Sequence, residues 1–323
     1  MNAQENEVIC LFGGYNEVYR FKLKKNATLS TRHGVFHAED IIYQTYGTTI
    51  YTRNKPKKSL ILLKLTAELN THCIDYVTQI VYTHDIALAT VWLNLFSGAK
   101  IIETGTGSGS VTVSFARSVG SNGRVYTFEA NSDRYQNFRK LIDDLKLTNV
   151  EIENRDVYEK GLQPSAEESE NFADGVFLDL PEPWRVLKHV KKVLKPCSVV
   201  VSFSPSIEQV LETKEEMNRQ GFQDIESIEI IMRPWGVFPR EQMDEKRRKV
   251  QASRQNSPKK PISLELPMVF ETSPFALYAQ ESYPHTGYLI MGRQPPLDED
   301  DIDFLPQDSK SRLRAHNIKA NPN

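Results

Sequence analysis

The feature that most constrains the fold is a run of three alternate glycines, Gly105, Gly107 and Gly109. A short apolar segment precedes the run, and apolar residues recur at helical spacing over residues 111–119. Glycine suits a backbone that turns sharply and that a ligand approaches without a Cβ in the way. We therefore predict the strand, turn and helix that open a nucleotide-binding βαβ unit.

Two acidic residues indicate which nucleotide is bound. Residues 124–128 form a predicted second strand, and Glu129 ends it, twenty residues beyond Gly109. A carboxylate at this place can bind both hydroxyls of a ribose. Glu103, before the first glycine, would repel the pyrophosphate of a dinucleotide but suits a cation. S-adenosylmethionine carries an ammonium and a sulfonium group and no phosphate, so we expect this cofactor, with a nicotinamide dinucleotide as the alternative.

Length and composition set outer limits. A chain of 323 residues has room for two domains. It contains no run of about 18 apolar residues that would span a membrane, and its polar N-terminus is not a secretory signal. The three cysteines lie far apart, without the spacing of a zinc site or a disulfide framework. We expect a reducing compartment, no membrane segment and no metal.

The N-terminal part of the chain is basic. Residues 1–64 contain ten Lys and Arg against five Asp and Glu, and apolar alternation near residues 18–23 and 60–65 predicts strands. We expect a small β-rich domain over residues 1–70, whose basic face either contacts a phosphate backbone or is only solvated. His33, in a polar turn, is by itself an ordinary turn residue.

Residues 71–294 alternate between predicted helices and strands, which indicates an α/β fold with an open, doubly wound sheet and a closing antiparallel pair. The predicted helices cover residues 86–93, 111–119, 138–145, 186–194 and 207–221, and the later strands cover 150–152, 175–179, 198–205, 222–232 and 288–291. A polar insertion over about residues 238–270 is expected to be mobile. Its basic run at residues 246–249 contacts nucleic acid or serves as a nuclear address. Residues 295–323 are expected to form a disordered acidic tail.

Further candidate site residues stand at the ends of predicted strands. Asp156 follows the third strand, where a carboxylate accepts from an adenine amine or else caps a helix. Asp179 ends the fourth strand, which lies beside the first, so it should face the methyl group across the crevice. Prolines after Asp179 stiffen its turn. Thr83 or Asp85 is the expected cap of the helix that closes one side of the cofactor pocket.

Four motifs together carry a resemblance to a known family. They are ETGTGSGS at residues 103–110, FLDLPEPW at 177–184, SFSPSIEQV at 202–210 and HTGYL at 285–289. From about residue 31 to residue 291 the chain resembles the catalytic subunits of the tRNA (adenine-58-N1)-methyltransferases, in their eukaryotic form. Bacterial members tend to have a tyrosine where Phe203 stands, so a role for that hydroxyl is not carried over.

The resemblance implies a class I, Rossmann-like methyltransferase domain behind a small N-terminal β-rich domain. It implies methyl transfer from S-adenosylmethionine to N1 of adenine-58 in the T-loop of tRNA. The implied assembly is a nuclear heterotetramer of two catalytic and two non-catalytic subunits. The implied cofactor-binding residues are Gln79, Thr83, Glu103, Gly105, Gly107, Ser108, Gly109, Ser110, Val111, Glu129, Arg134, Asp156, Val157 and Asp179. The implied substrate-binding residues are Thr31, Arg32, His33, Gly34, Pro181 and His285.

Asp179 is the expected catalytic residue. N1 of adenine already has an in-plane lone pair, so it needs no strong base, but the methylated base is cationic at neutral pH. A carboxylate near N6 would orient the base and stabilise this charge. Because N1 lies on the pairing edge, the base must be unpaired or flipped out. Two alternatives stay open: methylation of another RNA adenine, and a non-catalytic cofactor-binding subunit, which should lack the glycine loop or the acid at position 179.

Overall fold

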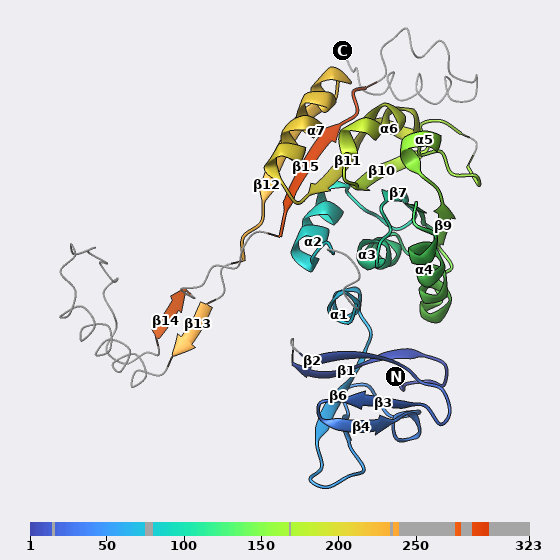
Figure 1. Cartoon of the computed structure of the whole chain (residues 1–323), viewed down its shortest axis with the longest axis vertical. Coiled ribbons are helices and arrows are strands. Elements are labelled where there is room, and N and C mark those ends of the chain that lie inside the picture. Colours follow the sequence, from blue (N-terminus) through green and yellow to red (C-terminus); the bar gives the residue numbers. More distant parts are fainter. Residues whose placement is uncertain are drawn as a thin grey trace, which may run out of the picture. The chain divides into compact units, whose positions relative to one another are not determined.

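The computed structural model describes residues 1–14, 17–74, 80–167, 169–232, 235–238, 275–278 and 286–296. Contacts divide the chain into two units, residues 1–229 with 286–323 and residues 230–285 (Figure 1). Among the described residues, the first unit contains three sheets, of four, seven and two strands. In the second unit, β13 (Trp235–Phe238) pairs antiparallel with β14 (Phe275–Tyr278).

The seven-stranded sheet is doubly wound, as predicted. Its order is β12 (Gln223–Glu229), β15 (Tyr288–Arg293), β11 (Leu194–Ser204), β10 (Ala173–Asp179), β7 (Lys100–Thr104), β8 (Arg124–Glu129) and β9 (Val150–Asn154). The five strands from β11 to β9 are parallel, and β15 runs antiparallel to both of its neighbours. The chain moves outward from β7 to β9 and then returns to β10 on the other side of β7. Strand order therefore reverses between β7 and β10, where ligands of such sheets bind at the carboxyl ends of the strands.

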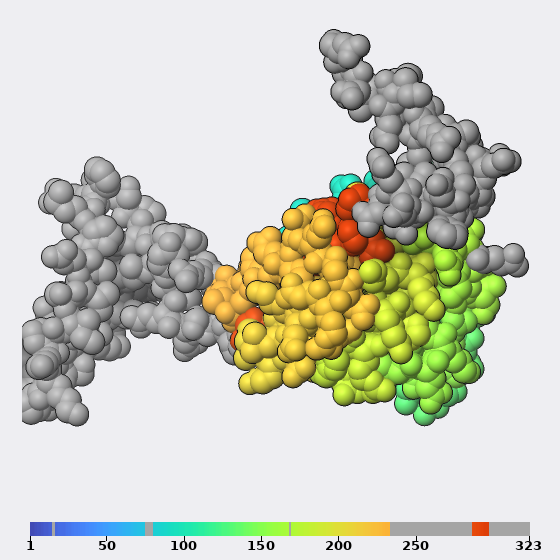
Figure 2. Space-filling model, turned by 90° about the horizontal axis from the view of Figure 1, so that it is seen from above, coloured from blue at the N-terminus to red at the C-terminus, as the bar shows by residue number. Residues whose placement is uncertain are grey.

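Helices cover both faces of this sheet (Figure 1). They are α2 (Thr83–Trp92), α3 (Ser110–Val119), α4 (Ser132–Leu145), α5 (Val157–Lys160), α6 (Leu187–Val193) and α7 (Ile207–Arg219), with a 3₁₀ turn η2 (Pro183–Val186). α3 packs on β7 and β8, and α4 packs on β8 and β9, whereas α7 packs on β11, β12 and β15. The outer face of α7, at the surface in Figure 2, carries the exposed Ile207 and Leu211.

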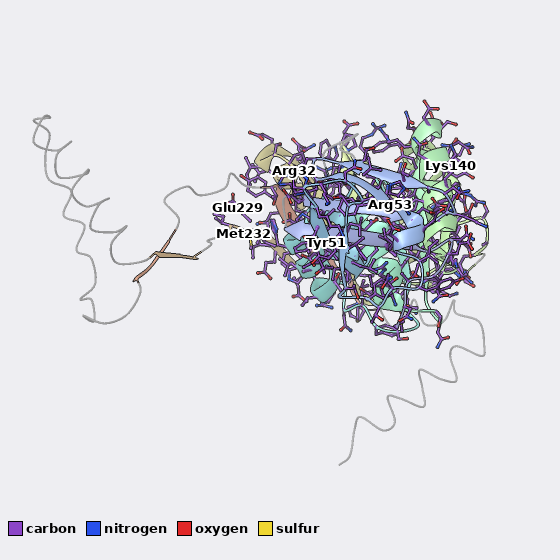
Figure 3. The ribbon with its side chains drawn as sticks, turned by 90° about the horizontal axis from the view of Figure 1, so that it is seen from below. Arg32, Tyr51, Arg53, Lys140, Glu229 and Met232 are labelled. Atoms are coloured by element: carbon purple, nitrogen blue, oxygen red, sulfur yellow. The ribbon has the colours of Figure 1, made fainter. Side chains whose placement is uncertain are left out.

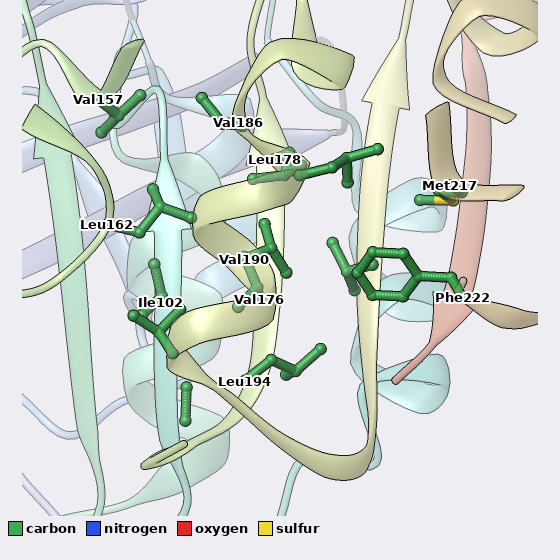
Figure 4. Packing of buried hydrophobic residues seen from close by; sticks show 14 of the residues in the cluster. Ile102, Val157, Leu162, Val176, Leu178, Val186, Val190, Leu194, Met217 and Phe222 are labelled. Atoms are coloured by element: carbon green, nitrogen blue, oxygen red, sulfur yellow. The ribbon is translucent and has the colours of Figure 1, made fainter. Parts of the chain in front are cut away.

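The alternation of side chains along β10 explains the two-sided core. Val176 and Leu178 join the buried cluster that includes Val190 of α6 and Met217 of α7 (Figure 4). Phe177 faces the opposite way, where its ring lies edge-on to that of Phe115 in α3, with 5.5 Å between centroids. Packing on each face therefore excludes water from the parallel strands, and ligands of such sheets bind at the carboxyl ends of the strands.

The N-terminal sheet confirms the strands predicted near residues 18–23 and 60–65. Its order is β2 (Glu17–Lys22), β1 (Val8–Gly14), β6 (Ser59–Lys64) and β5 (Thr49–Tyr51). A hairpin of β3 (Thr28–Thr31) and β4 (Gly34–His37) and a 3₁₀ turn η1 (Ala38–Asp40) accompany it, and α1 (Ala67–His72) follows. Two basic side chains here, both labelled in Figure 3, are paired with acids: Arg32 with Glu17, and Arg53 with Asp40 at 2.8 Å. This pairing lowers the positive charge available to a phosphate backbone.

Local predictions differ from the structure in several places. The N-cap of α2 is Tyr82, which makes no side-chain cap bond, so the prediction of Thr83 or Asp85 as the cap was wrong. Asp85 instead turns inward and is 1% exposed. Helix α6 ends at Val193, and β11 begins at the next residue.

The β13–β14 ladder was not predicted from the sequence, and β12 is shorter than the predicted strand. Most of the expected insertion, residues 239–270, and the tail from residue 297 lie outside the described residues. Within the described part of the chain, no helix is long and apolar enough to cross a membrane.

Candidate active site

The glycine loop lies directly beside the end of β10. Gly105, Gly107 and Gly109 have φ angles of +78°, +53° and +78°, which favour glycine. A Cβ on Gly105 would lie 2.0 Å from the carbonyl oxygen of Asp179, and one on Gly109 would lie 1.9 Å from a ring carbon of Phe138. Gly107 is therefore required by its φ angle, and Gly105 and Gly109 are required both by their φ angles and by the atoms packed against them.

Glu129 is fixed at the end of β8. It is 2% exposed, and its Oε1 accepts from the backbone N–H of Asn131 at 2.9 Å and from Nη2 of Arg134 at 2.8 Å. Its Oε2 accepts from the backbone N–H of Gly107 at 3.0 Å. The loop amide that would serve a phosphate thus already faces a carboxylate, which disfavours a nicotinamide dinucleotide. One lone pair of Oε2 remains for a ribose hydroxyl.

Glu103 lies beneath the glycine loop. Its side chain is 1% exposed, and its Oε2 accepts from Oγ1 of Thr112 in α3 at 2.6 Å. The pKa of Glu103 is raised to about 8, mainly by burial and also by the nearby carboxylates of Asp179 and Glu129. Such a group favours a neighbouring cation, because a positive charge stabilises its ionised form.

Asp179 ends β10 and is half-buried. It stands beside Phe203 of β11 in the sheet register, and burial raises its pKa to about 7, with the carboxylate of Glu129 as a second cause. Glu103, Glu129 and Asp179 thus converge on the crevice between β7 and β10. The three carboxylates, with a glycine cradle that a Cβ would fill, fit a cationic adenosine ligand such as S-adenosylmethionine.

The turn after Asp179 is held by more than its prolines. Nε2 of Gln209 in α7 donates to the carbonyl oxygen of Pro181 at 2.9 Å, and the hydroxyl of Tyr158 accepts from the backbone N–H of Glu182 at 3.0 Å. The sequence interpretation missed both residues as supports of the site. Gln209 lies in one of the four motifs quoted above, so a signal for it existed.

The structure brings some of the other predicted cofactor residues together. A pocket of about 270 Å³ beside the loop is lined by Gly107, Ser108 and Arg134, with Arg20 of β2, Ile74 and further residues of α4 around them. Thr83 is the first residue of α2 and is half-buried.

Other predicted residues have structural roles. Asp156 caps α5, accepting from the backbone N–H of Tyr158 at 2.8 Å, so the capping alternative is confirmed for this side chain. The hydroxyl of Ser110 is buried in a hydrogen bond with Thr71 of α1 at 2.7 Å. Val111 and Val157 are buried.

The predicted substrate residues are less connected. Oγ1 of Thr31 donates to the carbonyl of Gly34, and Nε2 of His33 lies 2.7 Å from Oε2 of Glu17, so this turn is bonded within the N-terminal sheet. Its tRNA contact stays a prediction. Gln79 and His285 lie outside the described residues. Among the described side chains there is no cluster of three or more His, Cys, Asp or Glu suited to a metal ion.

Solved structures share the fold. A SAM-dependent O-methyltransferase from Thermotoga maritima superimposes with a TM-score of 0.70 at 22% identity, covering 92% of this chain and 96% of the other. The tRNA (m1A58) methyltransferase TrmI from Aquifex aeolicus gives a TM-score of 0.65 at 23% identity, covering 92% and 100%. At these identities the likeness shows the fold alone, a class I methyltransferase sheet.

Sequence relatives are more specific. A protein of Candida albicans is 34% identical over 236 residues, covering 72% of this chain and 70% of the relative. A protein of Cryptococcus neoformans is 32% identical over 235 residues, covering 72% of this chain but 53% of the relative. Both are named tRNA (adenine(58)-N(1))-methyltransferase catalytic subunits. The matched region thus spans about half the length of the Cryptococcus relative.

The model of one protein family matches residues 58–294, which include the glycine loop, all three crevice carboxylates and β15. That family is described as the tRNA methyltransferase complex GCD14 subunit. The match covers most of the chain and agrees with the fold and with the crevice. This chain belongs to the tRNA methyltransferase complex GCD14 subunit family.

Proposed function

We propose that this chain is the catalytic subunit of a tRNA methyltransferase, which transfers a methyl group from S-adenosylmethionine to N1 of adenine-58. The observation that carries the proposal is the position of Asp179 at the end of β10, where its backbone carbonyl oxygen lies against Gly105 of the glycine loop and where burial, helped by the carboxylate of Glu129, raises the pKa of its carboxyl group. The names of the relatives from Candida albicans and Cryptococcus neoformans support the acceptor.

The chemistry requires charge stabilisation more than base catalysis. S-adenosylmethionine supplies an electrophilic methyl group on a sulfonium. As the S–CH₃ bond breaks and the N1–CH₃ bond forms, the positive charge passes from sulfur to the adenine ring. In its ionised form, Asp179 provides a negative charge for that ring and an acceptor for an N6 hydrogen. If the product loses its N6 proton, the same carboxylate can take it.

The raised pKa of Asp179 fits this role. At about 7, the carboxyl group is near half-ionised at neutral pH. A neighbouring cation lowers the pKa of a carboxyl group, so Asp179 becomes ionised as the crevice takes up positive charge. The residue thus responds to the charge it is there to stabilise.

The same proposal includes partners and place of action. We propose tRNA as the substrate, a non-catalytic subunit as the partner in an assembly of two copies of each, and the nucleus as the location. The family description as a subunit of a complex supports the partner. Imaging of a fluorescent fusion, with residues 246–249 intact or replaced by alanine, tests the location.

The test uses the full chain with and without the candidate partner subunit, unmodified tRNA and methyl-labelled S-adenosylmethionine. The tRNA is digested, and the labelled nucleoside is identified. We expect labelled 1-methyladenosine at position 58. Asp179→Ala should lower turnover by about 10²–10³, the usual loss on removing one preorganised electrostatic group. Asp143→Asn, an exposed carboxylate on α4, is the matched control.

Each other outcome has a definite meaning. Label in another nucleoside would keep the cofactor and overturn the acceptor. Cofactor binding without label in any mixture would favour a non-catalytic subunit. Normal turnover of Asp179→Ala, with the fold intact by circular dichroism, would remove Asp179 from the mechanism.

A further inference from the structure

A further buried carboxylate, Asp85, lies outside the residues assigned to the active site above. It is in the first turn of α2 and is 1% exposed. Its Oδ2 accepts from Oγ1 of Thr286 at 2.8 Å, although the two residues are 201 positions apart. Nε2 of His84 lies 3.2 Å from the same hydroxyl oxygen and 3.5 Å from Oδ2 of Asp85. The bonds are satisfied together if His84 donates to Thr286 and Thr286 donates to Asp85.

Thr286 lies at the edge of the sheet where Asp179 stands. In the register, Tyr288 of β15 is opposite Ser204, the last residue of β11, and Leu289 is opposite Phe203. Phe203 is in turn opposite Asp179 of β10. Thr286 precedes Tyr288 by two residues, so it lies beyond the carboxyl end of β11, on the side of the crevice away from β7.

The next residue, Gly287, connects the Asp85–Thr286 hydrogen bond to Phe203, the neighbour of Asp179 in the sheet. A Cβ on Gly287 would lie 2.5 Å from Cζ of Phe203 and 3.0 Å from the carbonyl oxygen of Ser204. The chain that enters β15 therefore passes in contact with the Phe203 ring. Any shift of Thr286 would move this contact, because the packing leaves no space between Gly287 and the ring.

The position of Asp85 is costly to the fold. Burial raises its pKa, and its Oδ1 is buried without a hydrogen-bond partner among the described residues. A carboxylate with an unsatisfied oxygen costs free energy that a capping position on the surface would avoid. The bond to Thr286 is the specific interaction that this burial provides. α2 itself packs on β11 and β15, so the bond joins elements already in contact.

We propose that Asp85 is a positioning residue for the methyl-acceptor base. Through Thr286 it holds the first turn of α2 against the chain entering β15, and through Gly287 it fixes the Phe203 wall beside Asp179. The proposal rests on the proposed function for the identity of the acceptor. It assigns to Asp85 and Thr286 the placement of the base and not the binding of the cofactor.

The test compares Thr286→Val, which removes the hydroxyl at nearly constant shape, with Thr286→Ser, which keeps it. Thr90→Val is the matched control, because the Thr90 hydroxyl lies on the same helix and donates to the carbonyl of Ile86, within its own helix. Methylation of tRNA is measured in the complete complex, with the affinity for S-adenosylmethionine determined separately. Hydrogen exchange of the peptides containing residues 83–86 and 286–289 reports on the Asp85–Thr286 hydrogen bond independently of enzyme activity.

For Thr286→Val we expect kcat to fall by about tenfold to 10²-fold, as for a small misplacement of a reacting group. We expect cofactor affinity within about threefold of the wild type and faster exchange in both peptides. Thr286→Ser and Thr90→Val should match the wild type. In a double-mutant cycle, Asp85→Ala should add little to Thr286→Val, because the two side chains form one interaction.

Wild-type kcat in Thr286→Val, equal losses in Thr286→Ser, or unchanged exchange would overturn the proposal. So would additive losses in the cycle. If the wild-type complex itself leaves adenine-58 unmethylated, the proposed function fails. Unchanged hydrogen exchange in Thr286→Val instead overturns only the positioning role of the Asp85–Thr286 hydrogen bond. The two failures are therefore distinguishable.

Discussion

Substitution of Glu103 by glutamine should change how the stability of the protein depends on pH. Glutamine has nearly the same shape and keeps an oxygen that can accept from Thr112, so the main change is the loss of an ionisable group. Burial raises the pKa of Glu103 from 4.5 to about 8. At about 1.36 kcal/mol per pKa unit, ionising Glu103 in the ligand-free protein costs up to about 5 kcal/mol.

The direction follows from proton binding. Between pH 4.5 and about 8, the folded state holds a proton on Glu103 that the unfolded state has released. The free energy of unfolding therefore falls as the pH rises through this window. Asp179, with its pKa raised to about 7, adds a fall of the same sign in both proteins. Only the contribution of Glu103 disappears in Glu103→Gln.

The assay is urea unfolding of the wild type and Glu103→Gln, without ligand, at pH 5, 6, 7 and 8. We expect the variant to gain on the wild type by several kcal/mol from pH 5 to pH 8, with Asp143→Asn showing no such trend. A difference between Glu103→Gln and the wild type that stays constant over this range would refute the reasoning. It would mean that Glu103 is ionised at low pH or is hydrated in the folded protein.

Three further predictions concern the crevice. Gly105→Ala should abolish cofactor binding, measured by calorimetry, while the protein stays folded, because the new Cβ would lie 2.0 Å from the carbonyl oxygen of Asp179. Retained affinity would show that the loop can move. Glu129→Gln should weaken cofactor affinity by about tenfold or more, because an amide group would replace one of two oxygens that accept from the N–H groups of Gly107, Asn131 and Arg134. Affinity for S-adenosylmethionine should rise from pH 6 to pH 8, by up to about tenfold per pH unit for each proton released, because a bound cation favours the ionised form of Asp179. Calorimetry in two buffers of different ionisation enthalpy would detect the protons, and a flat pH profile without proton release would contradict this prediction.

Much of the fold and of the crevice could be predicted because its signals are local. The three glycines need their own φ angles, and Glu129 follows directly from the end of its strand. Parallel strands bring their carboxyl ends to one edge, so acids that follow successive strands converge there. The motif residues Glu103 and Asp179 accordingly lie in the predicted crevice.

The protonation and ion pairing of the charged side chains depend on their surroundings in the folded protein. The sequence indicated that Glu103 suits a cation, but its pKa of about 8 comes from complete burial under the glycine loop. The basic N-terminal composition was correct, yet the pairing of Arg32 with Glu17 and of Arg53 with Asp40 reduces what that charge can do. Such pairings join different strands and turns, and periodicity carries no information about them.

Helix α2 shows the difference between what a local sequence pattern predicts and what contacts between distant residues add. Apolar spacing among neighbouring residues predicts a helix that begins near Thr83, and the structure contains it. The inward turn of Asp85 to Thr286, in place of a capping role, depends on a contact between distant parts of the chain. The buried bond forms because the chain entering the closing strand, 201 residues later, lies beside the end of β11. No local pattern can specify a partner that the sheet topology alone brings into contact.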